Sequence, residues 1–149
     1  MKHAWGWLLL AACGGTSGEP LKGSIAFTYG TSMPKMTVGS AVEKKDMPGK
    51  MVVQIGDDNV DCGTDLDNSF ASGTFVFFTV DATTPSTDAN AAIAVEHSSG
   101  GNISLNEAGG NLTIDTVMPR VTGSLTFETT DQDVGTISVS GNFDVKRCF

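Results

Sequence analysis

Short runs that alternate apolar residues with small or polar ones follow one another along the chain after residue 22. Alternation with a period of two is typical of strands that have one buried face and one solvated face. Glycines, asparagines and prolines separate the runs, so the pattern predicts one strand about every 8–12 residues. Before the C-terminal region, the predicted strands cover residues 25–29, 51–55, 75–80, 93–95, 103–105 and 112–114.

Three segments add detail to this pattern. The run at residues 75–80 is apolar at nearly every position, which predicts a central strand covered on both faces. The pairs Gly100–Gly101 and Gly109–Gly110 predict tight turns, because glycine adopts the positive φ values that such turns need. No segment keeps a helical period over several turns, and only the polar residues 42–50 have room for a short helical turn.

A C-terminal hairpin is the clearest element that the pattern predicts. Two runs alternate strictly and flank a predicted loop at residues 129–135. A register slip of one residue would expose phenylalanines, so the pairing of the two strands is well specified. The residues predicted to face the core are Val121, Gly123, Leu125 and Phe127 in the first strand, and Ile137, Val139, Gly141, Phe143 and Val145 in the second.

The cadence of strands predicts an all-β fold. We expect an antiparallel β-sandwich of about seven to nine strands, Ig-like or jelly-roll-like, in a single domain at residues 23–149. A chain of this length is sufficient for one domain with one hydrophobic core.

The N-terminus carries the most specific motif. Lys2 and His3 precede an apolar run at residues 4–10, and the run ends in Leu10-Ala11-Ala12-Cys13. This arrangement resembles the signal peptide of a bacterial lipoprotein. The resemblance implies cleavage after residue 12, acylation of Cys13 with diacylglycerol and a further fatty acid such as palmitate, and a membrane anchor.

The residues after Cys13 fit the same resemblance. Residues 13–22 begin with small and polar side chains, which predicts a flexible tether between the lipid and the domain. Gly14 rather than aspartate follows the cysteine, and by resemblance to enterobacterial lipoproteins this favours the outer membrane. The implied location is therefore the bacterial cell envelope.

The C-terminal hairpin carries a second resemblance. Segments 121–127 and 135–145, closed by Cys148, are similar to the tails of a group of uncharacterised bacterial lipoproteins. Those tails end in a Gly-small-Phe-Asp strand followed by a cysteine. This resemblance implies a β-sandwich and no known activity.

The number of cysteines and the net charge limit the compartment and the partners that we expect for this protein. Lipidation of Cys13 leaves Cys62 and Cys148, which predict a disulfide in an oxidising compartment. The net charge is −8, and loss of Lys2 with the signal peptide leaves −9 on residues 13–149. This charge argues against nucleic acid as a partner and against a basic patch for anionic lipid. The partners that remain are the membrane, through the lipid, and an envelope protein.

Residues 57–67 hold five aspartates and one asparagine. Calcium prefers six to eight oxygen ligands on a loop of this kind. The spacing is not that of an EF-hand, because the glycine comes one place late at Gly63 and position twelve is Asn68 instead of glutamate. An acidic, solvated loop held by Cys62 is the simpler interpretation, and a calcium-dependent binding module is the alternative. Its ligands would be Asp57, Asn59, Asp61, Asp65 and Asp67.

Catalytic motifs find little support. Outside the signal segment the chain has one histidine, His97, and it lacks a Gly-x-Ser-x-Gly motif, so hydrolytic triads are incomplete. A carboxylate pair remains an alternative, but no spacing marks one. We therefore expect a non-enzymatic envelope lipoprotein that acts as a binding, assembly or surface-structural module.

Overall fold

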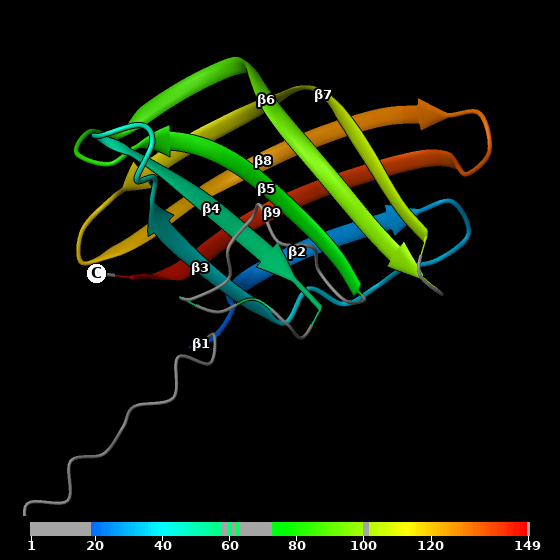
Figure 1. Cartoon of the computed structure of the whole chain (residues 1–149), viewed down its shortest axis with the longest axis horizontal. Helices are drawn as coiled ribbons and strands as arrows, with labels where there is room; N and C mark the ends of the chain where they lie inside the picture. Colours follow the sequence, from blue (N-terminus) through cyan, green and yellow to red (C-terminus); the bar gives the residue numbers. More distant parts are fainter. Residues whose placement is uncertain (1–18, 58–59, 61, 63–72, 100–101, 149) are drawn as a thin grey trace, which may run out of the picture.

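The computed structural model of the chain describes residues 19–57, 60, 62, 73–99 and 102–148. All regular elements in this part are β-strands (Figure 1). No helix in the described ranges is long and apolar enough to cross a membrane. The strands are β1 (Glu19–Pro20), β2 (Lys22–Tyr29), β3 (Val38–Glu43), β4 (Lys50–Gly56), β5 (Gly73–Asp81), β6 (Ser86–Ser99), β7 (Asn102–Thr116), β8 (Arg120–Asp131) and β9 (Gly135–Arg147).

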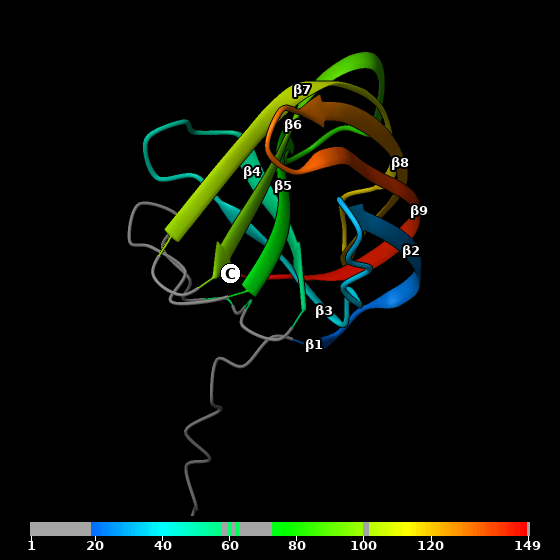
Figure 2. The ribbon, with the colours of Figure 1, turned by 90° about the vertical axis from the view of Figure 1, so that its right-hand side faces the viewer.

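The strands form one sheet that closes on itself. From β3 to β9, each strand pairs with the next in an antiparallel ladder. The end of β9 then pairs with β3 in parallel, through Ser40–Lys146 and Ala41–Arg147, and we call this contact the seam. Where β3 and β9 diverge, β1 pairs with β3 and β2 pairs with β9. The result is a barrel of seven strands with two additional strands, and its strands curve around a shared interior (Figure 2).

The prediction of a β-sandwich is therefore wrong. The predicted all-β class and the predicted disulfide both agree with the structure. Alternation specifies which face of each strand is buried, but not what covers that face. In this chain the buried face meets the far side of its own sheet, because β9 pairs with both β8 and β3. A sheet that closes in this way leaves fewer strand edges open than two stacked sheets do.

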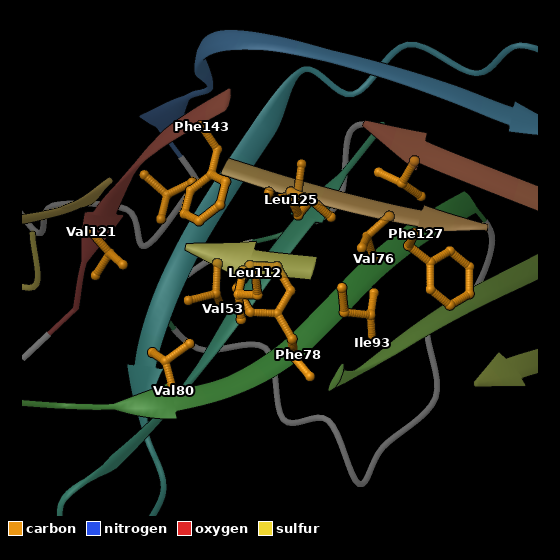
Figure 3. Packing of buried hydrophobic residues seen from close by; sticks show 14 of the residues in the cluster. Val53, Val76, Phe78, Val80, Ile93, Leu112, Val121, Leu125, Phe127 and Phe143 are labelled. Carbon is orange, nitrogen blue, oxygen red and sulfur yellow. The ribbon is translucent and has the colours of Figure 1, made fainter. Parts of the chain in front are cut away.

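The interior contains one main hydrophobic cluster with contributions from β2 to β9. Its side chains point toward one another from opposite walls of the barrel (Figure 3). The labelled members in that view are Val53, Val76, Phe78, Val80, Ile93, Leu112, Val121, Leu125, Phe127 and Phe143.

The C-terminal hairpin has the predicted faces. Val121, Leu125 and Phe127 of β8 are buried, and Ser124, Thr126 and Glu128 between and beyond them are exposed. In β9 the predicted inward residues Ile137, Val139, Phe143 and Val145 are all buried. The two strands extend into the predicted loop, so that Asp131 pairs directly with Gly135.

Strand β5 is covered on both faces only in its first half. Val76, Phe78 and Val80 belong to the interior cluster. On the outer face, Phe75 is fully buried against Val60. Further along that face the side chains become more exposed, so the prediction of a fully covered strand holds for part of β5.

Two predicted turns fall elsewhere. Gly109 and Gly110 lie inside β7, so the two strands predicted around them are a single strand. A Cβ on Gly110 would lie 2.8 Å from the main-chain oxygen of Thr126 and from Cδ1 of Ile93. Glycine is required here for close packing. Residues 100–101 lie outside the described part of the chain, and residues 44–49 form bends and turns without a helix.

The seam ends in a buried arginine. Nη1 of Arg147 donates to the main-chain oxygens of Ala82, at 2.8 Å, and Val117, at 2.9 Å. Nη2 donates to Oε1 of Glu43 at 2.6 Å. The next residue, Cys148, donates its main-chain N–H to Ala41 and forms the disulfide with Cys62. One end of the barrel is thus held together by hydrogen bonds to two loops and by one covalent bond.

We predict that Gly141→Ala strongly destabilises the barrel. Gly141 has a φ of 140°, and a Cβ there would lie 1.9 Å from the main-chain oxygen of Ser24 on β2. The control is Gly135→Ala, since Gly135 has a φ of 92° with open space around the position of its Cβ. Urea unfolding should show a loss of about 1–2 kcal/mol for the control, from backbone strain alone, and a clearly larger loss for Gly141→Ala. Equal losses would contradict the packing argument.

We also predict that Arg147→Met lowers the free energy of unfolding by about 3 kcal/mol, because two carbonyl groups lose their buried donor. Lys44→Met is the matched control, since Lys44 forms only a 3.8 Å ion pair with the exposed Asp46. Its loss should stay below about 1 kcal/mol. The measurement is denaturant unfolding with the disulfide intact, and similar values for the two variants would rule out a special role for the buried guanidinium.

Candidate functional site

A groove of about 660 Å³ opens in the barrel wall between the end of β5 and the first half of β6. The β5–β6 ladder stops at the pair Phe78–Ile93, although β5 continues to Asp81 and β6 begins at Ser86. Beyond that point β6 arches away from β5 and pairs only with β7 (Figure 1). The separation of the two strands creates the groove.

Local sequence explains why β6 changes direction. The β6–β7 register shifts between Asp88 and Ala91. Oδ1 of Asp88 accepts a 2.8 Å hydrogen bond from the main-chain N–H of Asn90, which replaces part of the regular ladder. Aspartate favours such local turns over a regular strand. A bulge of this kind bends a strand and is common beside functional sites.

A second aspartate fixes the loop at the mouth of the groove. Oδ1 of Asp81 accepts hydrogen bonds from the main-chain N–H groups of Thr83, at 2.8 Å, and Thr84, at 3.1 Å. The hydroxyl of Thr83 donates to the same oxygen at 2.7 Å. These bonds, with the Thr83 main-chain donor first, lower the pKa of Asp81 below its ordinary value. Asp81 is therefore anionic at neutral pH.

The groove combines an apolar floor with a polar rim. Phe78, Val80 and Leu112 form part of the floor, and the alanines of β6 leave space above it. Hydroxyl groups and charges surround this floor. The polar and charged lining residues are Lys50, Thr79, Asp81, Thr84, Ser86, Thr87, Asp88 and Glu107.

The charges in the groove are mainly negative. Among the described lining residues there are three carboxylates, those of Asp81, Asp88 and Glu107, and one cation, Lys50. Nζ of Lys50 lies 3.7 Å from Oδ2 of Asp81, so these two charges offset each other. The groove is consequently suited to a ligand with positive charge and some apolar surface.

The predicted calcium ligands lie mostly outside the described residues. This applies to Asn59, Asp61, Asp65 and Asp67. Asp57 is described: its Oδ2 accepts from the main-chain N–H of Thr74 at 3.1 Å, and its buried Oδ1 has no hydrogen-bond partner among the described residues. Within the described ranges, no group of three or more His, Cys, Asp or Glu side chains is arranged to hold a metal ion.

The predicted cysteine sites differ in outcome. Cys62 and Cys148 form the disulfide, with 5.5 Å between their Cα atoms. Cys13 lies outside the described residues, as do residues 1–12 and most of the predicted tether. β1 and the start of β2 fall within the later part of the tether range.

The groove between β5 and β6 was not predicted from the sequence. Asp81 and Asp88 lie in a polar stretch between two predicted strands, where carboxylates usually face water. The residues Asp88-Ala89-Asn90 favour a turn. From sequence alone, however, a turn that bends a single strand cannot be distinguished from a loop that connects two strands. Glu107 belongs to a segment in which glycines suggested a turn.

Glu96 is a half-buried carboxylate on the outer face of β6, outside the groove. It pairs with Phe75 on one side and with Leu105 on the other. Its buried Oε1 has no hydrogen-bond partner in the described part of the chain. Burial raises the pKa of Glu96 above its ordinary value.

Comparison with protein-family models, curated proteins and solved structures finds no match to this chain.

We predict that Glu96→Gln stabilises the protein at neutral pH. The ordinary pKa is 4.5 and the folded value is higher, so the folded state holds more protons in that interval. Stability therefore falls as pH rises through the interval, and the penalty persists above it. Thermal unfolding should show a higher Tm for Glu96→Gln at pH 7 and no difference near about pH 3.5, below the unfolded pKa. Glu128→Gln, at an exposed site on β8, is the control and should change little at either pH.

Proposed function

We infer that this protein is a non-enzymatic lipoprotein of the bacterial cell envelope, anchored through Cys13, whose barrel binds a partner in the groove between β5 and β6. The Cys62–Cys148 disulfide is the observation that carries this proposal. The chain has three cysteines, and the bridge uses two of them. Cys13, directly after the apolar segment, is the remaining thiol, and disulfides of this kind are typical of oxidising compartments.

The position of β1 also supports the proposal. Five residues, 14–18, separate Cys13 from Glu19, so the Cα atoms of Cys13 and Glu19 lie at most about 21 Å apart. An acylated Cys13 would therefore keep the barrel close to the membrane surface. A binding module in this position would meet envelope proteins rather than cytoplasmic ones, and Gly14 favours the outer membrane by resemblance.

Ion pairs hold β1 at the point where the anchor would pull on the barrel. Nη1 of Arg120 lies 2.7 Å from Oε2 of Glu19, and Nζ of Lys146 lies 3.7 Å from Oε1. Arg120 also binds Asp144 on β9. The hydrogen bond from Arg120 lowers the pKa of Glu19 below its ordinary value, so the pairs persist at neutral pH. A pulling force on the tether would therefore act on β8 and β9 as well as on β1, through these ion pairs.

The groove supports a binding role more than a catalytic one. Asp81 has a lowered pKa and holds its charge, so it is a poor proton donor at neutral pH. The hydrogen bonds from Thr83 and Thr84 to Asp81 hold the turn at this end of the groove in place. A rigid concave surface lowers the entropy lost when a partner binds.

We predict that Cys13→Ser abolishes lipid attachment and releases the domain from membranes. The matched control is the double variant Cys62→Ser/Cys148→Ser, which removes the bridge and keeps the acyl-accepting thiol. The measurement is fractionation of a bacterial host that expresses the full chain, together with intact mass of the protein from each fraction. The parent and the control should carry acyl mass on a chain that starts at Cys13. Membrane attachment of Cys13→Ser with an unchanged mass would overturn the lipoprotein proposal.

A further inference from the structure

The chemistry of the groove identifies the class of partner, provided that the groove is the binding surface inferred above. We propose that the groove binds an extended, basic segment of another polypeptide, which adds as a strand to the open edge of β5. Three features carry this proposal: the open edge of β5, the apolar floor and polar rim of the groove, and the negative charge of the rim.

The open edge of β5 supplies main-chain recognition. On one side β5 pairs with β4 from Phe75 to its last residue, Asp81. On the other side the β6 ladder ends at Phe78. Among the described strands, residues 79–81 therefore have a partner on only one side, and the groove lies along the other. A strand edge of this kind pairs readily with an extended peptide.

The two walls suit a chain whose side chains alternate. Successive residues of an added strand point to opposite faces. One set would face the apolar floor at Phe78, Ala91 and Leu112, where small or β-branched side chains fit. The other set would face the rim and its carboxylates. A groove of about 660 Å³ has the size of a ligand site, and a strand rises about 3.3 Å per residue, so a short segment of about five residues fills it.

The uncompensated charge selects a basic segment. Lys50 pairs with Asp81. In the ranges that the structure describes, neither Asp88 nor Glu107 takes part in an ion pair. Both are exposed, one on each side of the β6 bend. Lysine or arginine side chains of the added strand would neutralise them, whereas an acidic partner would be repelled.

Hydrogen bonds hold the described residues around the groove in place. Its lining residues, from β4 to β7, all lie in the described ranges. The loop at its mouth is fixed from both sides, because Ala82 donates its N–H to Gly49 and accepts from Arg147. The edge of β5 is therefore presented in one defined conformation.

The test uses the full chain in mild detergent and a fluorescein-labelled heptapeptide, Thr-Lys-Val-Thr-Val-Lys-Thr, with blocked ends. Fluorescence anisotropy should show saturable binding. Asp88→Asn/Glu107→Gln should weaken that binding at least tenfold. The matched control is Glu128→Gln/Asp133→Asn, which removes the same charge at exposed positions of β8 and the β8–β9 turn and should leave the affinity unchanged.

Two further peptides separate strand addition from attraction between charges. A version with N-methylated main-chain nitrogens keeps the lysines but cannot pair with β5, and it should lose binding. A version with glutamate in place of lysine should also fail to bind. Hydrogen exchange should show new protection at Thr79 and Asp81, whose main-chain groups point away from β4, only with the parent peptide.

Several outcomes would overturn the proposal. The first is that the N-methylated peptide binds as tightly as the parent peptide. The second is that spermidine alone displaces the parent peptide. Either result would indicate a site for small cations. Absence of binding by the parent peptide, or an unchanged affinity in the double variant, would overturn the proposal as well. Failure here is distinguishable from failure of the anchor, because Cys13→Ser changes membrane attachment and leaves the groove intact.

Discussion

The barrel is closed by the short parallel seam between β3 and β9, and Arg147 is the side chain that holds this seam in place. The seam itself contains only the pairs Ser40–Lys146 and Ala41–Arg147. From the end of β9, the buried guanidinium reaches the loop after β5, the loop after β7 and Glu43 on β3. Each of these segments begins or ends a strand of the barrel wall. Without this donor, two buried carbonyl groups would lose their partner, and β3 and β9 would be joined through the short main-chain seam and the hydrogen bond from Cys148 to Ala41.

Closure also explains the glycines along β8 and β9. Strands that curve into a narrow barrel bring main chain close to the side chains and carbonyl groups of their neighbours. A Cβ on Gly123 would lie 2.1 Å from the carbonyl oxygen of Thr113 and 3.0 Å from the ring of Phe143. Gly123 pairs with Phe143 and makes room for its ring, whereas Gly141 makes room for the main chain of β2 at Ser24. The large residues therefore fill the interior without forcing the walls apart.

Local patterns predicted most of the strands and the faces of the C-terminal hairpin, because a period of two is read from neighbouring residues, but they did not predict β1 or β3. The inward positions of β8 and β9 followed from this pattern alone, and the bridge between Cys62 and Cys148 followed from the cysteine count once the lipoprotein resemblance had set Cys13 aside. The closure of the sheet did not, because it depends on β9 meeting β3 from the far end of the chain. The groove was missed for a related reason: the bulge between Asp88 and Ala91 bends β6 only in the context of its pairing with β7.

The seam and the groove are physically connected through Ala82. This residue directly follows β5, and its carbonyl group accepts the hydrogen bond from Arg147 while its N–H donates to Gly49. Asp81, one residue earlier, holds Thr83 and Thr84 in the turn at the mouth of the groove. The interactions that close the barrel thus also fix the point at which β5 separates from β6. An open strand edge in a flexible loop would invite unspecific association, whereas an edge held in a closed barrel accepts a segment of one shape and charge.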